Sequence, residues 1–304
     1  MEVVIAMGID AGATSRDSDM STAQKLFKRA AVFLRVIDHI VPTTLNHEYT
    51  FVSDEWFEQW VQSGDFTIER MNFIVALELI EKAHLASMGA LLRARRWADA
   101  TCLMYEKENF LGWAAASRGL LESAGDTCDG LVLIPDALTL YHRAITECLN
   151  GKSDAVIDAG ELDNMLVHFV HARWMRTKRG EENILKAKEN INYVSILEPA
   201  IPKVASLYHE LCSVCHPSSA SIELFFDLVP DSGLKLSPAK DAAAISAVIA
   251  EYPDALPQAL KLHCTSPLFI LRVLHKFKIH PQIEILKKLD WKRIDEEIEG
   301  HLRS

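Results

Sequence analysis

The sequence predicts an all-α protein, built as a multi-helix bundle. Apolar residues recur every three or four positions through most of the 304 residues, which is the period of an amphipathic helix. Serine and threonine, which cap helix N-termini, precede several of these runs, and proline or glycine follows them. The exception is near residues 221–236, where the apolar residues form a short unbroken run. There we expect a short strand or a short extended arm.

The first predicted helices follow a tail. Residues 1–20 lack helical periodicity and are interpreted as an N-terminal tail. Ser21 is a suitable N-cap for a helix that Pro42 ends. Ser53 caps a second helix, which carries two tryptophans on one side. Residues of this type at that spacing are more typical of a core than of a binding platform.

The middle of the chain holds the longest periodic segment, Thr67–Trp97. It predicts either one helix of about thirty residues or two helices joined near Gly89. Ala98–Ser123 is expected to continue as helix, with Leu103 among its inward-facing residues. Two more helices are predicted, over Pro135–Leu149 and Asp163–Arg176.

The C-terminal third is predicted as helices separated by prolines. These cover Ala239–Glu251, Pro257–His263, Ser266–Phe277 and Pro281–Leu302. The weakest joint in the pattern lies near residues 217–237. We therefore divide the chain into a helical bundle core over residues 21–220 and a C-terminal helical subdomain, residues 221–304, packed on that core.

Composition places the chain among intracellular globular proteins. Hydrophobic residues make up 49% and charged residues 24%, and the formal net charge is −10. This negative charge repels nucleic acid, so any such contact needs a local basic patch. Six cysteines in 304 residues do not form a disulfide framework, which favours reduced thiols and a cytoplasmic location. No stretch reaches the length of about 18 apolar residues that a membrane span needs, so we expect no membrane contact.

The stretch Leu207–Ser219 is the densest in groups that could do chemistry. Cys212, Cys215 and His216 within it match the spacing of c-type haem attachment, but the chain has no credible export signal. Together with His168-x-x-His171 they also suggest zinc ligands, although both pairs are predicted inside helices. We interpret the two cysteines as small buried apolar residues and expect no metal and no cofactor.

A second metal-like pattern is Glu81-x-x-His84, which is half of the helix motif of di-iron bundles. Such a site needs a second pair of the same kind and two further carboxylates, and the sequence contains no second Glu-x-x-His. We therefore expect Glu81 and His84 to lie on a helix surface.

The candidate catalytic residues are Arg118, Glu122, Tyr208 and His216. Arg118 and Glu122 are four positions apart on one predicted helix, where they can form an ion pair. His216 precedes Pro217, so the helix that carries Tyr208 must end there. We predict that His216 is largely buried, bonds a polar group on the Arg118 helix and shares a cluster with Tyr208. A plain salt bridge at the rim of the core is the alternative for Arg118 and Glu122.

The same positions carry a resemblance to a known superfamily. Arg118-x-x-x-Glu122, followed by Tyr208-x-x-Leu-Cys-x-x-x-His216-Pro217, resembles bacterial helical proteins of the HEPN-like superfamily, over about residues 70–220. The resemblance implies a helical bundle, frequent dimers, and roles as ribonucleases of toxin or phage-defence systems. Their nuclease motif is an arginine followed by histidine after four to six residues. Arg35 and Arg272 are the nearest matches, and both have the wrong spacing, so nuclease activity is not expected.

One predicted helix end is basic and bears an aromatic side chain. The candidate nucleic-acid-binding residues there are Arg173, Trp174, Arg176, Lys178 and Arg179. They could contact phosphates and stack a base. Basic residues at the C-terminal end of a helix are equally natural without any ligand.

These observations lead to three functional hypotheses. The first is an intracellular HEPN-like module in regulation, phage defence or stress response, which acts through a protein partner, a homodimer or RNA. The second is an enzyme whose polar site uses Arg118, Glu122, Tyr208 and His216. The third is a structural scaffold.

Overall fold

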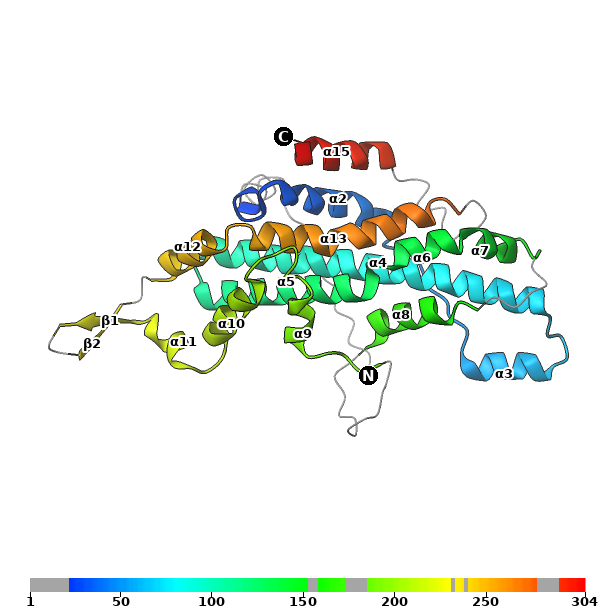
Figure 1. Ribbon diagram of the computed structural model, residues 1–304, viewed down its shortest axis with the longest axis horizontal. Helices are drawn as coiled ribbons and strands as arrows, with labels where there is room; N and C mark the ends of the chain where they lie inside the picture. Colours follow the sequence, from blue (N-terminus) through cyan, green and yellow to red (C-terminus); the bar gives the residue numbers. More distant parts are fainter. Residues whose placement is uncertain are drawn as a thin grey trace.

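The structure is a computed structural model, and helices dominate it. It describes residues 22–152, 158–172, 185–230, 233–237, 240–277 and 290–303. Helices make up 74% of the described residues, and the strands there form one small two-stranded sheet. The helices run along one long axis (Figure 1). The all-α prediction is therefore confirmed.

The N-terminal helix is interrupted. Residues 22–27 are helical, and the chain then passes through η1 (Lys28–Ala31), α2 (Val32–Ile40) and η2 (Val41–Thr43). The predicted single helix ending at Pro42 is wrong, because Lys28 takes a left-handed φ of 52°, which breaks the α-helical hydrogen-bond pattern. The predicted tail and the cap Ser21 lie outside the described residues.

Helices α3 (Asp54–Gln62) and α4 (Ile68–Glu106) begin at caps that the sequence provides. Ser53 Oγ accepts from the backbone N–H of Trp56, as predicted, and Thr67 caps α4 in the same way. Helix α4 is 39 residues long and continuous through Gly89, so the single-helix alternative is confirmed.

The predicted continuation of this helix from Ala98 to Ser123 is wrong. Glu108 has a φ of 49°, and α4 ends before it. Asn109 then caps α5 (Phe110–Leu131), its side-chain oxygen accepting from the N–H of Gly112 at 2.8 Å. Leu103, expected to face inward, is exposed.

Five helices follow α5. They are α6 (Ile134–Leu140), α7 (His142–Leu149), α8 (Gly160–His171), α9 (Asn190–Ser195) and α10 (Val204–Cys215). The predicted helix over Pro135–Leu149 is split at Tyr141, whose ψ of 0° ends α6. The turn after α7 contains Gly151, which takes a φ of 62°.

The stretch after Pro217 is a short helix and a hairpin. Helix α11 spans Ser219–Glu223, and strands β1 (Phe226–Val229) and β2 (Gly233–Leu236) pair antiparallel. Figure 1 shows them projecting from one end of the helical body. The predicted extended arm is therefore a two-stranded hairpin.

The C-terminal helices are α12 (Asp241–Glu251), α13 (Ala255–Leu274) and α15 (Trp291–Arg303). The two helices predicted over Pro257–His263 and Ser266–Phe277 are one helix, α13, with Pro267 buried inside it. Proline in a helix interior removes a hydrogen bond and costs about 3 kcal/mol in isolation. Burial of most of α13 outweighs this cost.

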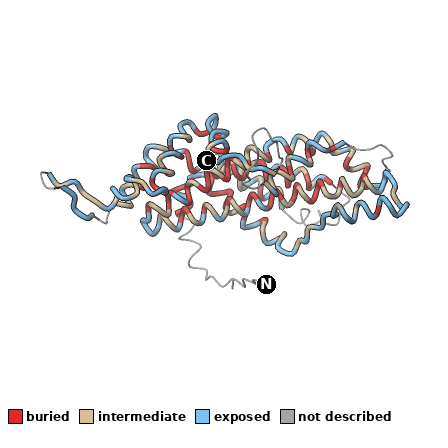
Figure 2. Tube along the Cα trace, turned by 90° about the horizontal axis from the view of Figure 1, so that it is seen from below, coloured by how far each residue is buried: buried red, intermediate tan, exposed pale blue. Residues whose placement is uncertain are grey.

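The core of the molecule lies where α13 packs against α4 and α5. Figure 2 shows the buried positions along this axis, with exposed positions outside it. Helices α9 and α10 cover α5 from one side, and α15 lies against α2. The division at residue 220 remains a prediction. Among the described residues, no helix combines the length and the apolar character that crossing a bilayer requires.

Candidate functional site

Three of the four candidate catalytic residues meet between α5 and α10. The Tyr208 hydroxyl donates a hydrogen bond of 2.7 Å to Glu122 Oε1, across 86 positions of sequence. Arg118 Nε lies 3.3 Å from the same carboxylate oxygen. The N–H of that Nε makes no hydrogen bond to a described residue, so the contact is an ion pair without an aligned hydrogen bond. The structure therefore joins the two sequence segments that carry the HEPN-like resemblance.

Helical spacing places these groups. Arg118 and Glu122 are one turn apart on α5, and Tyr208, Cys212 and Cys215 recur on one face of α10. The Arg118 charge acts on both thiols and on the Tyr208 hydroxyl, so all five side chains belong to one cluster. We call it the α5–α10 cluster.

A carboxylate fixes the start of α10. Lys203 has a left-handed φ of 65° and precedes the helix without capping it through its own side chain. Glu198 does this instead, its two carboxylate oxygens accepting from the backbone N–H groups of Lys203 at 2.9 Å and Ala205 at 3.3 Å. A negative charge at a helix N-terminus is favourable. Glu198 thereby helps set the position of Tyr208 against α5.

The environment keeps Arg118, Tyr208 and Cys215 each in one protonation state near neutral pH. Burial, followed by the Glu122 carboxylate, raises the pKa of Tyr208. Burial also raises the pKa of Cys215, more than Arg118 lowers it. Burial alone would lower the pKa of Arg118, but Glu122, the thiols and Tyr208 raise it overall. The arginine is therefore charged, while Tyr208 and Cys215 keep their protons.

His216 is not part of the buried cluster. It is exposed at the end of α10, and its backbone N–H donates to the carbonyl of Cys212 at 2.9 Å. The prediction of a largely buried His216 is wrong. Its backbone is extended, with φ −88° and ψ 155°, as a residue before proline requires. This conformation directs the chain away from α5 instead of turning the imidazole inward.

The thiols of Cys212 and Cys215 are half-buried and pack against the core. The prediction that they are small buried apolar residues is therefore correct in that they pack against the core, but they are only half-buried. Among the described residues, no group of three or more histidine, cysteine, aspartate or glutamate side chains is arranged to hold a metal ion.

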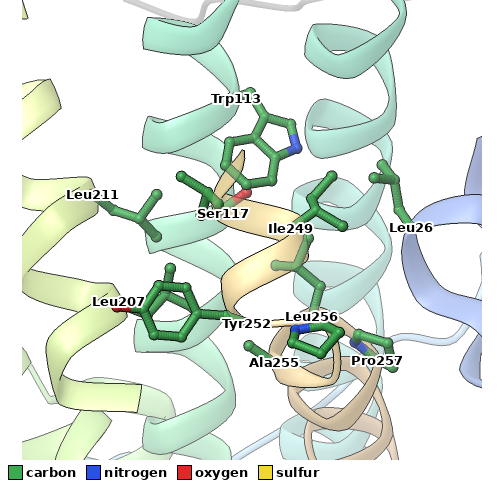
Figure 3. Close-up of a pocket in the computed structure, with 12 residues that line it drawn as sticks. Leu26, Trp113, Ser117, Leu207, Leu211, Ile249, Tyr252, Ala255, Leu256 and Pro257 are labelled. Carbon is green, nitrogen blue, oxygen red and sulfur yellow. The ribbon is translucent and has the colours of Figure 1, made fainter. Parts of the chain in front are cut away.

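An apolar pocket lies beside the cluster, where α5, α10 and α13 meet (Figure 3). Leu207 and Leu211 of α10 line it, together with Trp113 and Ser117 of α5. The indole nitrogen of Trp113 and the hydroxyl of Ser117 are buried there without a described hydrogen-bond partner. Its volume of about 10 Å³ is close to the smallest that holds one water molecule. It has no room for a substrate.

A second polar cluster involves residues that the sequence placed on a helix surface. Glu81 and His84 are 2% and 4% exposed, so that prediction is wrong. His47 Nε2 and Glu81 Oε2 share a hydrogen bond of 2.9 Å, and the Tyr49 hydroxyl and His84 Nδ1 share one of 2.6 Å. The segment before α3 thus covers this face of α4. We call these four residues the α4 latch.

The environment of the α4 latch shifts the pKa values of His84 and Tyr49. Burial, followed by the nearby His47, lowers the pKa of His84 to about 4. Burial and the Glu81 carboxylate raise the pKa of Tyr49. A third contact, from the backbone N–H of Val52 to Glu78 Oε1 at 2.7 Å, completes the attachment to α4. One sequence signal could have revealed it: Glu78, Glu81 and His84 recur at intervals of three residues along α4, among apolar neighbours.

The candidate nucleic-acid-binding residues, Arg173, Trp174, Arg176, Lys178 and Arg179, lie outside the described residues. The predicted helix Asp163–Arg176 is wrong at its C-terminal end, because α8 ends at His171 and Ala172 is extended, with φ −62° and ψ 137°. RNA contact through this patch therefore stays a prediction.

Comparison with protein families, with curated proteins and with solved structures finds no match to this chain.

Replacing Tyr208 with phenylalanine is expected to lower the free energy of unfolding by about 2 kcal/mol, because the half-buried Glu122 carboxylate loses the hydrogen bond that the Tyr208 hydroxyl donates to it. Urea denaturation measures this. The control is Tyr141→Phe, since the Tyr141 hydroxyl makes no side-chain hydrogen bond to a described residue. Equal stability of the two variants would show that the Tyr208 contact contributes nothing.

Proposed function

We propose that this chain is a HEPN-like helical module that acts in bacterial regulation or phage defence through contact with a partner, and that the α5–α10 cluster is its functional centre. One observation carries the proposal. The two motif segments of the resemblance, far apart in sequence, are joined by the hydrogen bond between Tyr208 and Glu122. A resemblance based on a few positions gains support when those positions form one cluster.

The chemistry of the cluster favours binding over catalysis. A nucleophile needs a lowered pKa or an adjacent base, whereas burial raises the pKa of Tyr208 and of Cys215. The adjoining pocket is too small for a substrate. The hydrogen bond from Tyr208 to Glu122, with Arg118 beside the same carboxylate oxygen, holds α10 in a fixed relation to α5, which suits a surface that must keep its shape for a partner.

An enzyme with a site built from Arg118, Glu122, Tyr208 and His216 is the second candidate. The observation in its favour is that the Arg118 side chain is 28% exposed and its Nε–H is not aligned with Glu122. Donors of this guanidinium therefore remain for an anionic group. The exposed imidazole of His216, at the end of the same α10, would be the proton carrier of such a site.

The proposal is tested in a bacterial host that expresses the full chain. We expect the wild-type protein to arrest growth or to reduce phage plating, and Arg118→Gln to lose this effect while it keeps its melting temperature. The matched control is Arg143→Gln, because Arg143 forms the same i,i+4 pair, with Glu147, but is almost fully exposed on α7. It should behave as the wild type.

Two outcomes would contradict the proposed function. A wild-type chain without effect on growth or on any phage tested removes the role in defence. A folded Arg118→Gln variant with full effect removes the α5–α10 cluster as its centre. Loss of the effect in His216→Ala, together with turnover of a substrate by the purified wild-type protein, would favour the enzyme.

A further inference from the structure

The hairpin at the end of the molecule exposes one purely apolar face. Side chains alternate between the faces of a strand, and the pairing puts Phe226 opposite Leu236 and Leu228 opposite Leu234 on the same face. Leu228, Leu234 and Leu236 are 86%, 65% and 71% exposed. Exposed side chains of this size gathered on one face mark an interaction site in a soluble protein.

The hairpin is held firmly at its base. Lys240 forms an ion pair of 2.6 Å with Asp227 and also donates to the carbonyl of Phe226. Ser237 N–H donates to the carbonyl of Phe225 at 2.8 Å. These contacts join the hairpin to the start of α12 and fix which face is turned outward. A two-stranded hairpin is only marginally stable in water by itself, so its apolar face gains from a cover.

A groove that could receive this face lies between α6 and α13. It has a volume of about 800 Å³, and its lining combines the apolar Val132, Phe269 and Val273 with polar and charged residues that include Asp136, Arg272 and Lys276. Phe269 is 53% exposed, although it is a large aromatic residue in the middle of a helix. The exposed Leu133 and Leu140, at either end of α6, extend the apolar surface near this groove.

A chain cannot fill its own groove with its own hairpin. The hairpin joins α12, which leads into the N-terminal end of α13, whereas the groove is lined by the C-terminal half of that helix, from Thr265 onward. Helix α13 has 20 residues and is therefore about 30 Å long. Figure 1 shows the hairpin beyond the α12 end and α6 toward the other end of the molecule.

We propose that two copies of this chain form a dimer in which the hairpin of each copy lies in the α6–α13 groove of the other. Both halves of the contact are present on one chain, so a two-fold axis satisfies both hairpins and both grooves at once. A stable interface buries about 800 Å² from each copy, which a hairpin of two four-residue strands does not provide alone. When each hairpin lies in the groove of the other copy, the dimer contains two such contacts and the buried area doubles.

This inference rests on the proposed function only in that it names a partner for the module, and it does not involve the α5–α10 cluster. Its test measures association alone, so the two proposals can fail separately. A chain that forms the dimer but has no effect in cells contradicts the function, and an active monomer contradicts the dimer.

The experiment is sedimentation velocity of the full chain over a range of concentrations. We expect a dimer for the wild type and monomers for the hairpin variant Leu234→Asp and the groove variant Phe269→Asp. Both positions are exposed, so the charge should leave the fold intact, and circular dichroism checks this. The control is Leu45→Asp, which changes an equally exposed leucine in the segment before α3 and should stay dimeric.

Mixing the two monomeric variants tests whether the hairpin of one copy lies in the groove of the other, as opposed to another dimer arrangement. The groove variant keeps an unchanged hairpin, and the hairpin variant keeps an unchanged groove. The mixture should therefore form a heterodimer with one intact hairpin–groove contact. A dimer that survives Phe269→Asp would indicate hairpins packed on each other and overturn the exchange. A monomeric wild type that dimerises only after removal of residues 1–20 would show that the tail covers the groove, and would overturn it as well.

Discussion

Replacing Gly125 with alanine is expected to destabilise the protein by about 3 kcal/mol, at the upper end of the cost of overpacking a core. Gly125 is buried in α5, where α9 crosses it. A Cβ atom at this position would lie 2.2 Å from the carbonyl oxygen of Tyr193 and 2.5 Å from its carbonyl carbon. These are backbone atoms, so no rotamer change can relieve the clash.

The expected damage extends beyond one contact, because α9 is attached to α5 at other points. Lys188 lies two residues before α9, and its Nζ binds the carboxylate of Asp129 on α5 at 2.6 Å and 2.7 Å. Moving α9 outward to admit a methyl group strains this contact as well. Denaturant unfolding at a single temperature, with the midpoint and slope compared to the wild type, measures the loss.

Gly89 provides the matched control for this prediction. It also lies inside a helix, α4, but it is exposed, and a Cβ atom there would meet nothing within 4 Å. Alanine has the higher helix propensity, so Gly89→Ala is expected to stabilise the protein by about 1 kcal/mol. If the two alanine variants shift stability in the same direction, the close approach of α5 and α9 does not exist in solution.

Periodicity predicted the helical class and the long helix α4, because a 39-residue amphipathic pattern outweighs a single glycine. It did not predict where helices end when the stop signal is a backbone conformation. Lys28 and Glu108 adopt positive φ, yet both residue types are common inside helices. The reverse error occurred at Pro267, where burial of α13 overrides a strong local stop signal.

The candidate site was predictable only where local spacing decides the contact. The Arg118–Glu122 pair follows from a four-residue interval on one helix. The contact of Tyr208 with Glu122 depends on how α10 docks on α5, and no local rule fixes that. His216 was misplaced because Pro217 fixes the backbone of the preceding residue but not the side of the chain on which it emerges.

The α4 latch was missed for a related reason. Glu81 and His84 are charged or polar residues on a helix with many other charged residues, and such residues usually face solvent. Their burial requires partners from elsewhere in the chain, which His47 and Tyr49 supply from the segment before α3. Buried polar groups are tolerated when they are paired, and here the pairing crosses more than thirty positions of sequence.

The latch should make the protein sensitive to mild acid. His84 has a pKa of about 4 in the folded state, against 6.5 for an unperturbed histidine, because burial and the nearby His47 disfavour its charged form. Between these two values the unfolded chain binds a proton that the folded chain does not. Unfolding therefore becomes easier as the pH falls from about 6.5 to about 4, and below that range His84 adds no further loss.

The contribution of His84 over this range is about 3 kcal/mol, from the cost of one pKa unit multiplied by the shift. It is obtained as the difference between the wild type and His84→Gln, whose side chain stays neutral and can still bond the Tyr49 hydroxyl. The variant should lose less stability than the wild type between pH 6.5 and 4. His39→Gln, which removes an exposed histidine from α2, should follow the wild-type curve. Parallel curves for the wild type and His84→Gln would mean that His84 is accessible to solvent and that the segment before α3 does not cover α4.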